Sequence, residues 1–85
     1  MANRYWVGGT GSWSDDDNHW ATSSGGTPAD GNLPTSSDNV YFDNNSFLSS
    51  SQTVTIDTTA SCNDMDWTGA SNSPTLTGSS VLNVY

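Results

Sequence analysis

The first twenty residues hold the side chains whose types and spacing best suit a binding site. Trp6, Trp13 and Trp20 recur at intervals of seven residues. Exposed, their flat rings would form a platform that stacks on sugars, and the chain would be a small carbohydrate-binding module with a polysaccharide partner. Buried, they would form the core of a cap, since each tryptophan can remove on the order of 200 Å² from water. Because the chain is small and poor in leucine and isoleucine, we favour the buried arrangement.

Three consecutive carboxylates lie between the second and third tryptophans. Asp15, Asp16 and Asp17 are the candidate metal ligands, because Ca²⁺ prefers carboxylate and carbonyl oxygens. Their spacing is not that of an EF-hand loop, and adjacent acids also form solvated turns or helix caps. We therefore expect no obligatory cofactor and keep Ca²⁺ as the alternative.

Patterns that would indicate catalysis are weak. His19 and Cys62 are the only histidine and the only cysteine, and nothing in their spacing places them together. Asp64 and Asp66 alternate along an expected strand, where charged side chains normally face water. The glycines at positions 8, 9 and 11 are followed by no lysine, so they do not match a phosphate-binding loop. We expect a non-catalytic protein.

Charge limits the partners. The chain carries nine aspartates, no glutamate and a single cation, Arg4, for a net charge of −8. Binding to phosphate backbones requires clustered lysine and arginine, so we expect neither nucleic acid nor an anionic membrane surface as a partner. No apolar stretch is long enough for membrane insertion, and the N-terminus shows no signal peptide.

Composition predicts one all-β domain over residues 1–85. Ser, Thr, Asn, Gly and Asp, which favour turns, make up 52 of the 85 residues, whereas Glu and Lys are absent. A Trp/Gly segment (1–20) precedes a loop (21–39) with a turn at Asp30-Gly31, and short β-strands follow (40–85). The single cysteine excludes an internal disulfide, so a core this small calls for a metal, large aromatic side chains or a neighbouring chain.

Alternation of apolar and polar residues locates the strands. In the clearest case Val54 and Ile56 face inward and the threonines beside them face outward. Short strands with small polar turns suit a β-sandwich, a β-barrel or a β-solenoid, and the shortness of these strands favours the solenoid. The expected strands span residues 39–43, 53–57, 64–68, 75–77 and 81–85.

The last expected strand predicts self-assembly. It carries Val81, Leu82, Val84 and Tyr85 with no charge, whereas monomeric proteins usually protect such an edge with lysine, proline or a bulge. An apolar strand at an open end needs a cap or a neighbour. We therefore expect a homo-oligomer, or binding to a larger β-helical partner, with these four residues in the contact.

The order of motifs resembles the start of bacteriophage tail or fibre-like proteins and of bacterial autotransporter-like β-helical surface proteins. It runs Trp6-x-Gly8-Gly9-x-Gly11-x-Trp13, then Pro34-x-x-x-Asp38-x-Val40-x-Phe42-Asp43, then Val54-x-Ile56-Asp57. The resemblance implies a β-solenoid with a Trp/Gly cap, a structural or attachment role, and a location on a virion or an extracellular surface.

Overall fold

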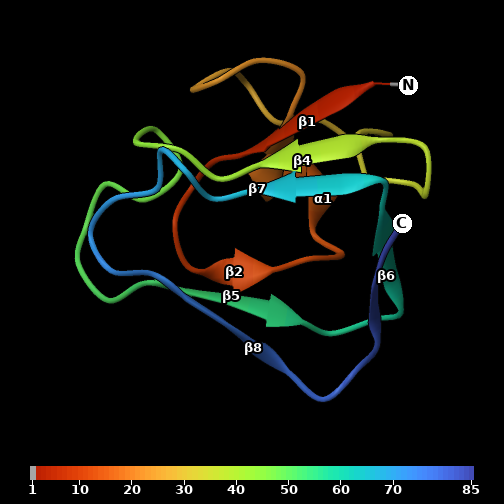
Figure 1. Ribbon diagram of the computed structural model, residues 1–85. Coiled ribbons are helices and arrows are strands. Elements are labelled where there is room, and N and C mark those ends of the chain that lie inside the picture. Colours follow the sequence, from red (N-terminus) through yellow and green to blue (C-terminus); the bar gives the residue numbers. More distant parts are fainter. Residues whose placement is uncertain (1) are drawn as a thin grey trace.

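A computed structural model describes residues 2–85, and its regular structure is almost entirely β (Figure 1). Every strand has two to four residues, because turn-forming residues interrupt each apolar stretch. The single helix in this range is one turn long. The elements are β1 (Asn3–Trp6), β2 (Gly11–Ser12), α1 (Asp16–His19), β3 (Trp20–Ala21), β4 (Asn39–Tyr41), β5 (Thr53–Ile56), β6 (Ala60–Cys62), β7 (Asp64–Asp66), β8 (Thr75–Gly78) and β9 (Leu82–Val84).

The strands form three small sheets, and every strand pair is parallel except β1 with β3. The sheet orders are β3-β1-β4-β7, β2-β5-β8 and β6-β9. Each parallel pair joins a strand to the third strand after it along the chain, as β1 pairs with β4 and β4 with β7. β3 instead pairs with β1 in the antiparallel sense. The three sheets surround a common interior (Figure 1).

Similar side chains lie above one another where sheets gain a strand. The Asn63 side chain donates to Asn39 at 2.9 Å, and Asn39 donates to Asn3 at 3.4 Å. On the same sheet the rings of Tyr5 and Tyr41 stack with centroids 4.9 Å apart. Register is thus fixed on the outer face as well as by the buried side chains.

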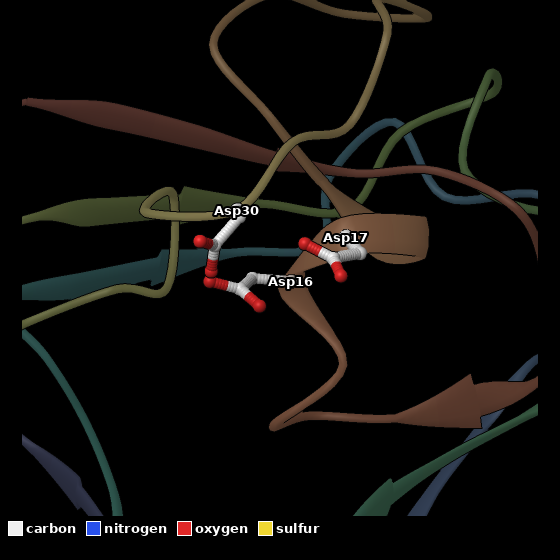
Figure 2. A group of neighbouring side chains, drawn as sticks. All are labelled: Asp16, Asp17 and Asp30. Carbon is white, nitrogen blue, oxygen red and sulfur yellow. The ribbon is translucent and has the colours of Figure 1, made fainter.

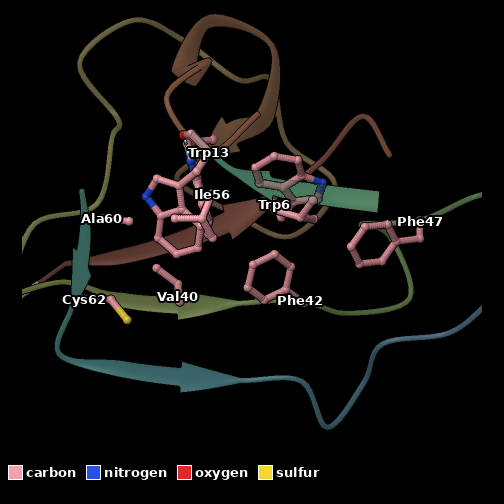
Figure 3. Close-up of a cluster of buried hydrophobic side chains, with 10 residues drawn as sticks. Trp6, Trp13, Val40, Phe42, Phe47, Ile56, Ala60 and Cys62 are labelled. Carbon is pink, nitrogen blue, oxygen red and sulfur yellow. Dashed lines mark hydrogen bonds between the residues drawn. The ribbon is translucent and has the colours of Figure 1, made fainter. Parts of the chain in front are cut away.

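The core combines aromatic rings from the N-terminal segment with inward side chains of the middle strands (Figure 3). Val40, Phe42 and Val54 are at most 1% exposed, and Ile56 is 5% exposed. The predicted period-two alternation is therefore confirmed for 39–43 and 53–57. Phe42 is central, since its ring contacts those of Trp6, Trp13, Trp20, Phe47 and Trp67.

The all-β class is confirmed, and each of the five expected strands exists with slightly different bounds. The turn at Asp30-Gly31 also forms, closed by the Asn32 amide donating to the Ala29 carbonyl. Five elements were not expected from the sequence. Four are the short pieces β1, β2, α1 and β3 within the Trp/Gly segment, and the fifth is β6, whose inward residues are the small Ala60 and Cys62.

Candidate functional site

The three tryptophans of the N-terminal segment form one buried cluster, the tryptophan cap. Trp6 and Trp20 are 0% exposed and Trp13 is 1% exposed. The Trp6 indole N–H donates to the Gly9 carbonyl and the Trp20 indole N–H donates to the Trp13 carbonyl, each at 2.8 Å. The rings of Trp13 and Trp20 meet edge to face with centroids 4.8 Å apart. These hydrogen bonds satisfy two of the three indole donors inside the core, as burial of a polar group demands.

His19 completes the cap. Its ring stacks flat on Trp6, with centroids 4.4 Å apart and 4° between planes, and its Nδ1 lies 2.7 Å from the Val7 carbonyl, which makes Nδ1 the donor in this pair. A Cβ at Gly11 would lie 1.9 Å from His19 Nε2, so only glycine leaves room for this ring. The glycines beside the tryptophans thus serve the packing of the cap.

Burial corrects the sugar-binding alternative. Stacking on a sugar requires an exposed ring face, and Trp6, Trp13 and Trp20 offer none because other aromatic rings cover them. The expected buried arrangement is confirmed, since Trp6 and Trp13 belong to one core cluster with Val40, Phe42 and Ile56. The cap is a structural element, and no pocket opens beside it in residues 2–85.

Two of the three candidate metal ligands lie together, and the third member of the group is a residue that the sequence did not suggest. Asp16, Asp17 and Asp30 bring carboxylate oxygens within 4.8 Å of one another (Figure 2). Asp15 instead accepts hydrogen bonds from the Asn18 side chain at 3.0 and 3.1 Å. Asp30 joins the group because its loop folds back, with the Gly31 amide donating to Asp16 at 2.9 Å. The Asp-Gly turn was the only signal in the sequence for this contact.

The electrostatics of this group are repulsive. Desolvation raises the pKa of Asp17, and the charges of Asp30, Asp16 and Asp15 raise it further. Such a group could hold a cation, but exposed carboxylates are common without one. The acidic group remains a candidate Ca²⁺ site with two exposed members and no buried ligand.

The residues considered for catalysis are buried in the core or make contacts within the fold. Cys62 is completely buried in the core, and desolvation followed by the charge of Asp64 raises the pKa of its thiol, whereas a nucleophilic cysteine needs a lowered pKa. His19 is held against Trp6 by its contact with Val7. Asp66 accepts hydrogen bonds from Thr68, which lower its pKa.

The remaining candidate is the end of the molecule formed by β7, β8 and β9, which we call the open end. These are the terminal strands of the three sheets, and each pairs on one side only. Inward side chains on the neighbouring strands β4, β5 and β6 are buried, but the residues paired with them on the open end are half-buried or exposed. The pairs are Val40 with Met65, Val54 with Leu76, Ala60 with Leu82 and Cys62 with Val84.

Backbone groups at the open end also point away from the protein. The amides of Thr75 and Tyr85 donate to the carbonyls of Gln52 and Cys62, so alternate amides of β8 and β9 point outward. Those outward amides belong to Leu76, Gly78, Leu82 and Val84. Outward N–H and C=O groups beside apolar side chains form a template for another strand.

Of the four residues expected in the assembly contact, three are more than half exposed at the open end. Val81, Val84 and Tyr85 are 58%, 53% and 72% exposed, and Leu82 is half-buried against the core. Met65, Trp67 and Leu76 belong to the same surface but were not included in that contact. The sequence indicates that these residues alternate with polar ones, but only the pairing of strands shows that they lie on or beside the terminal strands β7 and β8.

Comparison with protein-family models, with curated proteins and with solved structures gave no match for this chain. Within residues 2–85, the one-turn helix is far too short to cross a bilayer.

Proposed function

We propose that this protein is a non-catalytic structural or attachment module, in which a tryptophan cap starts a short β-solenoid and the open end binds another β-rich chain. The bound chain is either a further copy of this protein or a larger β-helical partner. The observation that carries the proposal is the loss of burial from one turn to the next. Residues buried in the middle turn have counterparts at the open end that remain half-exposed, such as Leu76 above Val54.

Parallel pairing supports the solenoid over the sandwich. A β-sandwich is built from antiparallel strands joined by hairpins and Greek keys. Here β4, β5 and β6 pair in parallel with β7, β8 and β9 in the same order. Thr53 pairs with Thr75 and Ala60 with Leu82 at an offset of 22 residues, and Asn39 pairs with Asp64 at an offset of 25. Chains that coil through three sheets generate this pattern without long crossovers.

The two ends of the molecule differ in a way that suits a module with one binding face. At the N-terminal end, the tryptophan cap and the antiparallel strand β3 cover the first turn. At the open end, apolar side chains and backbone donors face outward. Repeat proteins cover both ends of their core, so the uncovered strands β7, β8 and β9 suit contact with a further turn of β-structure.

The setting of such a module is a bacteriophage virion or a bacterial surface assembly. The resemblance to tail or fibre-like and autotransporter-like β-helical proteins supports this, as does the acidic surface, which carries a net charge of −8. High net charge keeps surface proteins soluble and apart until a specific contact forms.

An extended chain tests the proposal. A second copy of residues 64–85 is appended directly after Tyr85, which continues the 22-residue offset without a linker. If the open end accepts a further turn, the extended chain melts at a higher temperature than the original and buries Trp67, whose fluorescence shifts to shorter wavelength. The added turn covers apolar side chains that water now reaches.

The control carries the same 22 residues in scrambled order, which keeps length, composition and charge. The scrambled extension should leave the melting temperature and the fluorescence near those of the original chain. Equal melting temperatures for the ordered and scrambled extensions would show that the open end does not accept a strand, and the proposal would fail.

A further inference from the structure

We propose that the open end is built for a basic partner and not for a second copy of this chain. The partner starts with a turn that runs parallel to β7, β8 and β9, places apolar side chains over Met65, Leu76 and Leu82, and carries Lys or Arg beside Asp64 and Asp66. This inference rests on the proposed function and names the partner of that same surface.

The negative charge at the open end favours a basic partner. Asp64 and Asp66 are exposed and flank the inward Met65 on the terminal strand of their sheet. The residues paired with them one turn earlier, Asn39 and Tyr41, are uncharged, so the chain does not stack one carboxylate on another. Opposite charges in neighbouring positions of a sheet stabilise pairing, and like charges oppose it.

A second copy cannot supply the missing cations. Arg4 is the only lysine or arginine in the chain, and it lies in β1, one strand behind the edge strand β3 that a second copy would present to β7. A two-fold contact in which β7 pairs with β7 would run antiparallel. Centred on Met65, that pairing sets Asp64 opposite Asp66 of the second copy, and the two chains together bring sixteen net negative charges to one assembly (−8 each).

Head-to-tail stacking of copies is also disfavoured by the fold. It requires free strand edges at the N-terminal end to receive β7, β8 and β9. There β3 already pairs with β1 in an antiparallel sense through Tyr5 and Trp6, and β2 has only two residues. The edge strand β6 matches β9 in length, but β3 and the two-residue β2 do not match β7 and β8, so the same protein offers only part of a matching surface.

The extended chain provides the test when its added turn is made in two forms. One form repeats residues 64–85 unchanged, and the other replaces both aspartates of the copied β7 by lysine. An added turn that keeps the 22-residue offset of β8 and β9 places these positions beside Asp64 and Asp66. We expect the lysine form to melt higher by about 4–8 °C in low salt. The difference should shrink in 1 M NaCl, where charges are screened within about 3 Å.

A matched variant locates the effect. Asp64→Asn with Asp66→Asn in the original turn should abolish the advantage of the lysine form, whereas Asp17→Asn with Asp30→Asn, at the N-terminal end, should leave it intact. An unchanged turn that stabilises as well as the lysine turn would overturn the charge inference while leaving the proposed function standing. Failure of both turns relative to the scrambled control would remove the proposed function itself.

Sedimentation of the unmodified chain tests the second half of the inference. At micromolar concentration and 150 mM salt we expect a folded monomer, because no copy offers the required cations. A stable dimer that Val84→Lys dissociates would overturn the inference and identify a second copy as the partner.

Discussion

Replacing Trp13 tests whether the tryptophan cap holds the fold together. Trp13 is 1% exposed and its ring packs against Trp20 and Phe42. At about 25 cal/mol per Å², burial of roughly 200 Å² corresponds to about 5 kcal/mol. Because neighbouring side chains refill part of the space, we expect Trp13→Ala to reduce the free energy of unfolding by about 3–5 kcal/mol. That is a large share of the stability of a small domain.

The indole N–H of Trp13 sharpens this prediction. It is buried without a hydrogen-bond partner, whereas the Trp20 N–H donates to the Trp13 carbonyl. Trp13→Phe removes an unsatisfied donor and keeps a ring, so it should cost clearly less than Trp20→Phe, which loses a hydrogen bond. Urea denaturation followed by circular dichroism measures all three variants. Unchanged unfolding of Trp13→Ala would refute the structural role of the cap.

Three further predictions concern charge and metal. Asp57 accepts hydrogen bonds from the Ser14 hydroxyl at 2.5 Å and from the Ser14 amide at 3.1 Å, which lower its pKa. The stability that these bonds contribute is present above the unfolded pKa and is lost as pH falls through the folded pKa. The melting temperatures of Asp57→Asn and of the original chain should therefore differ at neutral pH and converge once pH falls below the folded pKa. The pKa of Asp17 is raised, so ionisation of this carboxyl opposes folding. Asp17→Asn should therefore melt at a higher temperature than the original chain at pH 7, and the difference should shrink as acid protonates Asp17. A lower melting temperature of Asp17→Asn at pH 7 would contradict this prediction. EDTA should leave the β-sheet circular dichroism unchanged, and loss of that signal would instead assign a structural metal to Asp16, Asp17 and Asp30.

The alternating strands were predictable because their pattern is local. Val54 and Ile56 face inward for the same reason that the threonines beside them face outward, and a period of two records this directly. Burial of the tryptophans followed from size, since a chain this short has few other large apolar side chains. Because these rings are buried, Trp6, Trp13 and Trp20 do not form a platform for stacking on sugars.

Pairing was not predictable, because it depends on contacts between distant residues. In the sequence, inward residues recur at intervals of eleven residues, from Val54 to Met65 and from Met65 to Leu76. In the structure, Met65 belongs to another sheet, and Val54 pairs with Leu76. The strand β6 was missed because Ala60 and Cys62 are small and carry a weak apolar signal. Asp30 reaches Asp16 only through the fold of the loop between them.

Amide hydrogen exchange in the original and extended chains tests the open end most directly. In the original chain, the outward amides of Leu76, Gly78, Leu82 and Val84 should exchange faster than the inward amides of Thr75 and Thr77. In the extended chain the same four outward amides should become protected, because the added turn accepts their hydrogen bonds. Outward amides that are already protected in the original chain, or that stay unprotected in the extended chain, would contradict an open end that accepts another strand.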